Sequence, residues 1–135
     1  MIVDTSALLA YFDRDEPDHT AVARVIEAAD EPLVVSPYVV AELDYLVATR
    51  QGVAAELAVL GELAGGAWDL PAFGPGDLAE ARAVVERFAD QAIGVADASN
   101  VVLASRYGTR TIATLDRRHF DVLRPAAGGR FSVLP

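Results

Sequence analysis

Short apolar runs alternate along this chain with longer stretches in which apolar residues recur at every third or fourth position. The short runs predict strands and the longer stretches predict helices, because side chains repeat their direction with different periods in the two elements. The predicted strands are Ile2–Val3, Leu33–Val35, a weak Trp68–Leu70, Thr111–Leu115 and, at the sheet edge, Phe131–Val133. The predicted helices are Ala7–Phe12, Pro17–Ala29, Ser36–Gly52, Val53–Leu63, Asp77–Phe88 and Val95–Arg106.

The order of these elements predicts the fold class. Strands that alternate with helices indicate an α/β domain with a mostly parallel central sheet and helices on both faces. Ser6 is the predicted cap of the first helix, and Gly74-Pro75-Gly76 is a predicted turn. No repeat, linker or low-complexity stretch interrupts the pattern, so we expect one domain over residues 1–135.

Composition narrows the chemistry that this domain can perform. The chain has no cysteine, which excludes disulfides, thiolate catalysis and cysteine zinc sites. All 11 basic residues are arginine, so mechanisms that need a lysine are also excluded. The net charge of −9 argues against binding of nucleic acid or anionic membranes by the whole surface, but it leaves room for a local, metal-assisted phosphate site.

The sequence predicts no membrane partner. It opens without a basic targeting region, and its longest uncharged run, Pro32–Ala41, is too short to span a bilayer. We therefore expect a cytoplasmic protein.

Four acidic residues stand where an acid is costly. Asp4 follows the first predicted strand and Asp116 follows the predicted strand that ends at Leu115, so both should reach the carboxyl edge of the sheet, where ligands collect. Glu42 and Asp97 lie beside apolar stripes of predicted helices. Neighbouring buried carboxylates repel one another unless a cation joins them. Hard oxygen ligands favour Mg²⁺, with Mn²⁺ as the alternative, over zinc.

Each of these acids also has a purely structural explanation. Asp4 could cap the first helix, and Asp116 could cap a turn over Arg117–Val122. Asp97 could face the positive end of its helix, and Glu42 could be an ordinary exposed glutamate. The other titratable residues are predicted to lie outside the site: Asp44 in solvent, Asp90 in a turn or cap, and His19 and His119 on the surface or in packing.

Four segments of the chain resemble the signature segments of the PIN domain, most closely those of the VapC-type toxins of bacterial toxin–antitoxin pairs. The segments are Val3–Ala10, Val40–Leu43, Val95–Ser99 and Thr114–Phe120. The resemblance implies a metal-dependent ribonuclease in which Asp4, Glu42, Asp97 and Asp116 form an acidic pocket. It implies that Asp4 and Asp97 chiefly hold the metal, that the other two acids complete the pocket, and that Ser6 supplies a hydroxyl beside it.

The resemblance also implies two kinds of partner. The family forms homodimers, and a VapB-type antitoxin binds it with a C-terminal segment that blocks the site. The substrate implied is RNA, whose phosphates we expect to meet Arg14, Arg117 and Arg118, because arginine forks grip phosphate oxygens.

The acidic pocket and its expected metal ion predict how RNA would be cleaved. A bound Mg²⁺ would offset the repulsion between pocket and phosphate and activate a water. No histidine is predicted to act as a general base and nothing activates the 2′-hydroxyl, so we expect 3′-hydroxyl and 5′-phosphate products.

Two other readings compete with this one. A haloacid-dehalogenase-like phosphatase or a receiver domain would need a lysine that this chain lacks. The alternative that stays open is a non-catalytic PIN-like module for protein binding or regulation, which Mg²⁺-dependent cleavage of RNA would rule out.

Overall fold

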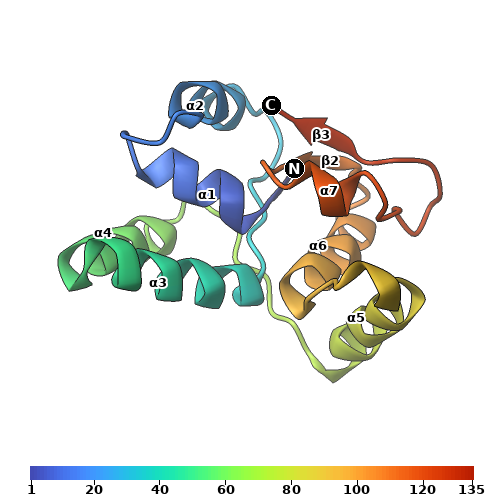
Figure 1. Cartoon of the computed structure of the whole chain (residues 1–135). Helices are drawn as coiled ribbons and strands as arrows, with labels where there is room; N and C mark the ends of the chain where they lie inside the picture. Colours follow the sequence, from blue (N-terminus) through green and yellow to red (C-terminus); the bar gives the residue numbers. More distant parts are fainter.

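The computed structural model describes residues 1–135 and shows a parallel sheet between two groups of helices (Figure 1). Its strands are β1 (Ile2–Val3), β2 (Thr111–Ala113) and β3 (Ser132–Leu134), in the order β1-β2-β3. Ile2 pairs with Ile112 and Ile112 with Val133, so the first strand along the chain lies next to β2. The last strand lies at the edge, as predicted.

The two middle strand predictions are wrong in extent. On the other side of β1 the sheet continues only through isolated parallel bridges, from Ile2 to Val34 and from Val34 to Asp69. Each segment meets its neighbour at a single position, because α3 begins at Pro37 and the chain beyond Asp69 leaves the sheet. The predicted strands at 33–35 and 68–70 are therefore only bridges.

Seven α-helices and one 3₁₀ turn make up the rest of the domain. They are α1 (Thr5–Phe12), α2 (His19–Glu27), α3 (Pro37–Gln51), α4 (Val53–Ala64), α5 (Pro75–Arg87), α6 (Val95–Arg106), α7 (Arg117–Phe120) and the turn η1 (Ala89–Gln91). None of these helices combines the length and the apolar character needed to cross a bilayer.

Three predicted helix starts are corrected by the structure. Helix α1 begins at Thr5, so Asp4 rather than Ser6 holds its N-cap position. Pro17 precedes α2 instead of opening it. Pro75 is the first residue of α5 and not part of a free turn, because the Asp77 carboxylate accepts a 2.7 Å hydrogen bond from the backbone N–H of Gly74 and starts the helix there.

Successive strand residues point to opposite faces of the sheet and so build two cores. Val3 and Ala113 lie in one apolar cluster, with buried side chains of α1, α2, α3 and α4. Ile2 and Ile112 lie in the other, with buried side chains of α5, α6 and α7. Helices therefore cover both faces, which confirms the predicted architecture.

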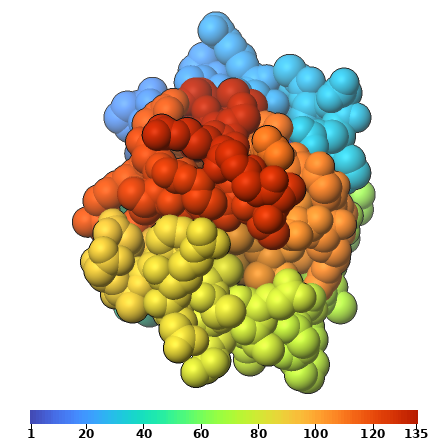
Figure 2. All heavy atoms as spheres, turned by 90° about the vertical axis from the view of Figure 1, so that its right-hand side faces the viewer, coloured from blue at the N-terminus to red at the C-terminus, as the bar shows by residue number.

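The second layer of helices is closed by the C-terminal part of the chain. Figure 2 shows α5 and the segment that follows α7 gathered on one face of the molecule. Beneath them α6 buries every residue from Ala98 to Ala104, including the polar Ser99 and Asn100. This burial positions one of the polar contacts of the site described next.

Candidate active site

Asp4 lies at the junction of β1 and α1, at the bottom of a pocket beyond the carboxyl ends of the strands. Its side chain is buried, yet it makes no capping bond to α1. Instead, Oδ1 accepts a 3.0 Å hydrogen bond from Asn100 Nδ2, and Oδ2 accepts bonds from Thr114 Oγ1 at 2.8 Å and Ser6 Oγ at 3.0 Å. Burial raises the pKa of Asp4, and the two hydroxyl donors oppose that rise.

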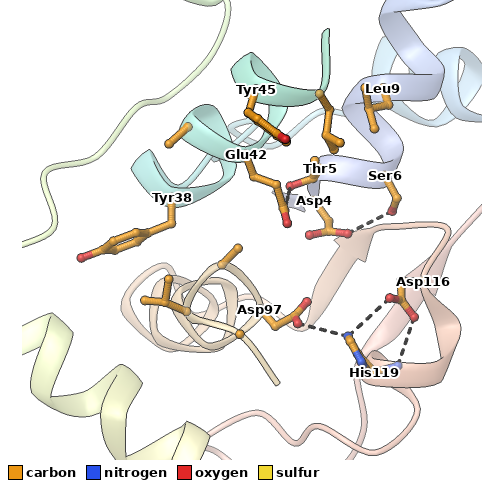
Figure 3. A pocket seen from close by; sticks show the side chains of 15 residues that line it. Asp4, Thr5, Ser6, Leu9, Tyr38, Glu42, Tyr45, Asp97, Asp116 and His119 are labelled. Atoms are coloured by element: carbon orange, nitrogen blue, oxygen red, sulfur yellow. Dashed lines mark hydrogen bonds and ion pairs between the residues drawn. The ribbon is translucent and has the colours of Figure 1, made fainter. Parts of the chain in front are cut away.

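Glu42 reaches the same pocket from α3. Its Oε2 accepts a 2.5 Å hydrogen bond from Oγ1 of Thr5, the first residue of α1. Figure 3 shows this contact beside Asp4, so the hydroxyl of Thr5 links the acid of one helix to the start of another. The contact fixes the direction of a long and otherwise exposed side chain.

Asp97 and Asp116 lie across the pocket and share one histidine. Nδ1 of His119 is 3.1 Å from Oδ2 of Asp97 and 3.3 Å from Oδ2 of Asp116 (Figure 3). Asp116 also accepts a 3.3 Å bond from the backbone N–H of His119 and so caps α7, which was one of its two expected roles. Burial, and then the nearby charge of Asp4, raise the pKa of Asp97 to about 6, while His119 opposes that shift.

All four acids line one cavity of about 630 Å³. Its lining combines the four carboxylates, the hydroxyls of Thr5 and Ser6, and His119 with apolar and aromatic side chains. The lining residues are Asp4, Thr5, Ser6, Leu9, Tyr38, Ala41, Glu42, Tyr45, Leu46, Gly94, Val95, Ala96, Asp97, Asp116 and His119.

Three details of the predicted acids are wrong. Strand β2 ends at Ala113, so Asp116 does not follow it directly; Thr114 and Leu115 lie between them. Glu42 is exposed at the pocket rim and not buried in an apolar face, while Asp44 is half-buried and not in solvent.

Two acids outside the pocket complete the comparison. Desolvation raises the pKa of Glu56 on α4, and the nearby charge of Asp44 raises it further. Asp90 lies in the η1 turn, as expected.

The predicted substrate-binding residues do not all lie at the pocket. Ser6 lines it, and Arg117 and Arg118 are exposed on α7 next to Asp116. Arg14 lines a different cavity, of about 470 Å³, together with His19. Nδ1 of His19 lies 2.8 Å from the backbone oxygen of Ala10, so this histidine has a packing role, as predicted.

Four polar residues of the site were not predicted from the sequence. His119 was predicted to be a surface or packing residue, but it lies in the pocket because α7 places it one turn after Asp116. Thr5, Asn100 and Thr114 position carboxylates. Asn100 is three residues after Asp97 on α6, a helical spacing that could have revealed it. Thr114 could not be found locally, because its partner is 110 residues away.

Comparisons with known proteins identify the family and the fold to which the chain is similar. The family model of the PIN domain matches residues 1–124. Ribonuclease VapC26 of Mycobacterium tuberculosis is 67% identical over 135 residues, which is 100% of both chains.

Two solved structures illustrate the similarity in fold. The crystal structure of Mycobacterium tuberculosis VapC20, a toxin that cleaves the sarcin-ricin loop, has a TM-score of 0.84 at 19% identity over 99% of this chain and 98% of its own. FitAcB from Neisseria gonorrhoeae has a TM-score of 0.62 at 20% identity, covering 99% and 96%. At such identities the likeness shows the fold alone. The match to the family model and the full-length relative show more: the chain belongs to the PIN domain family, among its VapC-type members.

Proposed function

We propose that this chain is the ribonuclease toxin of a toxin–antitoxin pair and hydrolyses RNA phosphodiesters at the pocket of the four acids. The observation that carries the proposal is the meeting of Asp4, Glu42, Asp97 and Asp116, from four separate segments, in one cavity. A relative that is 67% identical over the whole chain is a ribonuclease, and that supports RNA as the substrate class.

The donors around the pocket fit a divalent cation. They are carboxylates and hydroxyls, the hard oxygen ligands that Mg²⁺ and Mn²⁺ prefer, and no arginine lines the cavity to neutralise them. Next to Asp4, Oδ1 of Asn100 is buried without a hydrogen-bond partner. No three acidic or histidine side chains converge into a ready-made ion site in this structure. Asp4 and Asp97 would chiefly hold the ion, and Glu42 and Asp116 would complete its surroundings.

The residues of the pocket divide the work of catalysis. A bound Mg²⁺ supplies positive charge to the substrate phosphate and lowers the pKa of water. Asn100, Thr114 and Ser6 hold the Asp4 carboxylate in one orientation, and Thr5 does the same for Glu42. Such prepositioning matters because misplaced carboxylates would have to reorganise during the reaction.

The position of His119 changes one part of the expected chemistry. The expected 3′-hydroxyl and 5′-phosphate products rested partly on the lack of a histidine near the site, and His119 lies in it. Nδ1 of His119 lies 3.1 Å and 3.3 Å from two carboxylates without making a hydrogen bond to either, and we propose that the ring packs between Asp97 and Asp116 and does not deprotonate the ribose. The 5′ ends of the product RNA test this: a 5′-hydroxyl with a cyclic phosphate would make His119 the base instead.

Two partners complete the proposal. A VapB-type antitoxin would restrain the enzyme by covering the pocket, and a homodimer would bring the Arg117 and Arg118 patches of two copies to one groove. Sedimentation of the purified protein, alone and with the antitoxin, measures both assemblies.

The decisive experiment is cleavage of bulk RNA by the purified protein with Mg²⁺, with Mn²⁺ and with a chelator. We expect cleavage with either ion and none with the chelator. The Asp97→Asn variant should be inactive, and Asp44→Asn, which changes an acid outside the pocket, should retain activity. Cleavage that persists in the chelator would contradict the metal-dependent mechanism, and a folded protein without any cleavage would leave the non-catalytic alternative.

A further inference from the structure

The arginines of this chain are concentrated in its C-terminal part. Five of the 11 arginines, but only two of the 20 acidic residues, lie between residues 110 and 130. That stretch has a formal charge of +3, whereas the rest of the chain has a charge of −12. We call the five residues the C-terminal arginines: Arg110, Arg117, Arg118, Arg124 and Arg130. Positive charge concentrated within so acidic a chain is typical of a surface that binds a polyanion.

Folding arranges the C-terminal arginines as a stripe that begins beside the acidic pocket. Helix α7 contains two of them and begins directly after Asp116. Its last residue, Phe120, packs edge-on against Phe131 with 5.8 Å between the ring centroids, so α7 lies close to Arg130. The backbone oxygen of Arg110 accepts a 2.8 Å hydrogen bond from the residue after Phe131. The stripe therefore crosses the face that the C-terminal segment covers in Figure 2, from the pocket to the edge of the sheet where β2 and β3 begin.

The charges of this stripe are not neutralised within the protein. None of the C-terminal arginines forms a salt bridge with an acid, and three of them donate to backbone oxygens instead. Nη2 of Arg117 donates a 2.5 Å hydrogen bond to the oxygen of Pro135. Nη1 of Arg124 donates a 2.7 Å bond to the backbone oxygen of Asp121, and Nη2 of Arg110 donates a 3.4 Å bond to the loop before β3. A carbonyl oxygen holds a guanidinium in place without cancelling its charge, and the remaining N–H donors stay available to a ligand.

The other side chains of this face identify the kind of polyanion. Proteins that bind single strands offer exposed aromatic rings on which bases stack. Here the rings of Phe120 and Phe131 are buried against each other, and Leu115 is the only exposed large apolar side chain between residues 110 and 130. Positively charged groups without a stacking surface suit the phosphates of double-helical RNA, which presents its backbone in a regular array and encloses its bases.

An anionic membrane is the competing polyanion. A bilayer is flat and wider than the protein, so it would also meet the acidic surface around the stripe, which it would repel. A membrane-binding surface also inserts several apolar side chains, and this face exposes only Leu115. An RNA helix is narrow and contacts the stripe alone, so RNA is the partner that the charge distribution favours.

We infer that the C-terminal arginines bind phosphates of a double-helical segment of RNA, outside the pocket in which the RNA is cleaved. The inference rests on the ribonuclease activity proposed above and adds a second binding surface to it. Arg110, Arg124 and Arg130 do not line the pocket, so they are positioning residues that hold the RNA and leave cleavage to the four acids.

Salt-dependent binding tests the inference in the Asp97→Asn background, in which the RNA should stay intact. The probes are a fluorescein-labelled RNA hairpin with a stem of about 16 base pairs and a single strand of the same length that cannot pair. Replacing Arg110, Arg124 and Arg130 together by glutamine should raise the Kd for the hairpin by about 10-fold at low salt. The slope of log Kd against log salt should fall by about 2 to 3, because each lost phosphate contact releases about one ion fewer. The single strand should respond less, because it has no fixed array of phosphates.

A matched variant controls for the loss of three charges. Replacing Arg50, Arg82 and Arg87 by glutamine removes the same charge from exposed positions of α3 and α5, and it should leave the Kd and the salt slope unchanged. Circular dichroism checks the fold of each variant. Should the first triple variant unfold, the double change Arg110→Gln with Arg130→Gln, at two exposed positions, should give about two thirds of the change in slope.

Kinetics give a second readout in the enzyme that retains Asp97. The change of Arg110, Arg124 and Arg130 should act on KM for the hairpin and hardly on kcat, because these arginines lie away from the reacting phosphate. The effect should largely disappear at about 0.2 M salt, where the attraction between exposed charges is screened. A loss confined to kcat would place the arginines in the chemical step and contradict a positioning role.

The outcomes separate this inference from the proposed function. If the unaltered protein does not cleave RNA, the proposed function fails, whatever the arginines bind. If it cleaves RNA and the two triple variants bind the hairpin equally well, only the inference about the C-terminal arginines is overturned. It is also overturned if the single strand loses as much affinity as the hairpin. Vesicles of phosphatidylserine and phosphatidylcholine test the competing partner: if the change weakens binding to vesicles and not to RNA, the stripe is a membrane-binding surface.

Discussion

Asp4 accepts hydrogen bonds from three uncharged side chains, whereas Asp97 and Asp116 share a single histidine across the same pocket. The Asp4 half is buried and tied to α6 and to the end of β2. The Asp97 half is more open, and the side chain of Asp116 is 41% exposed. The neutral donors hold the Asp4 carboxylate in one orientation without cancelling its charge. The single imidazole of His119 lies between two carboxylates and leaves their orientation less restricted. One half of the pocket is therefore a rigid support and the other is adaptable.

Removing a charge from each half gives the largest expected contrast. Asp4→Asn should lower kcat/KM by about 1000-fold or more, roughly 4 kcal/mol, because the change lies at the fixed centre of the site. Asp116→Asn should cost about 10- to 100-fold, because the exposed Asp116 also serves to cap α7. Single-turnover cleavage of one labelled RNA at saturating Mg²⁺ measures both. Equal losses would erase the distinction between the halves.

The next prediction compares two acids of α3. Glu42→Gln keeps the bond to Thr5 within reach but removes the charge, and it should lower cleavage by about 100-fold or more, roughly 2.7 kcal/mol. Asp44→Asn should stay within a few-fold, because Asp44 lies outside the pocket. The same cleavage assay applies, with circular dichroism as the check of folding. Should Asp44→Asn abolish activity while Glu42→Gln does not, the pocket has been drawn with the wrong acid of α3.

The free energy of unfolding should also distinguish the Asp97 half of the pocket from the Asp4 half. The pKa of Asp97 rises from its usual 3.8 to about 6 on folding, so its ionised form is unfavourable in the native state. This penalty is absent below about pH 4, grows as the pH rises to 6 and is complete above that. Asp97→Asn should therefore raise the metal-free stability near pH 7 by about 1–3 kcal/mol and have little effect at pH 4.

Metal binding should act in the opposite direction on the same variant. At 100 times its Kd, Mg²⁺ or Mn²⁺ should stabilise the unaltered protein by about 2.7 kcal/mol, and Asp97→Asn should reduce that gain. Thermal melts across pH, with and without the ion, give both numbers. A melt of the unaltered protein that does not respond to either ion would count against the metal site.

A change to the support of Asp4 should have a smaller effect. Thr114→Val keeps the shape of the side chain but removes the donor to Asp4 and the acceptor for the backbone N–H of Asp116. We expect a loss of about 1–2 kcal/mol in the free energy of unfolding, measured in urea. Thr49→Val, on the exposed part of α3, is the matched control and should change little. A neutral Thr114→Val would show that Asp4 does not depend on this donor.

The smallest effects should come from the arginines. Replacing both Arg117 and Arg118 by alanine should raise KM by about 3- to 10-fold, since exposed charges on α7 contribute modestly and through salt-screened attraction. Arg14→Ala should have a still smaller effect, because Arg14 lines the other cavity. KM measured at two salt concentrations tests this ranking, and an Arg14→Ala effect larger than that of the pair would reverse it.

The sequence was sufficient for the parts of this molecule that depend on local pattern. Ile2 and Val3 predict a buried strand, and helix α6 has the predicted bounds because its glycine boundary and apolar repeat are local signals. The starts of α1 and α5 were misplaced, because a strand end and an Asp77 cap override the usual capping and turn preferences. The four acids and the Ser6 hydroxyl could be named, but the hydrogen bonds that Asn100 and Thr114 make to Asp4 could not. Asn100 and Thr114 meet Asp4 only because the sheet brings together residues 96 and 110 positions apart.

That long-range pairing sets when a growing chain can become active. Asp4 and Glu42 are made early in translation, but β1 gains its neighbour β2 only after residues 111–113 have left the ribosome. Until then Thr114 and Asp116 are missing from the pocket, and contacts so distant in sequence are slow to form. A nascent chain on the ribosome therefore lacks the completed site until residues 111–116 have emerged. An antitoxin that recognises the completed pocket would first bind the protein when the site becomes able to act on RNA.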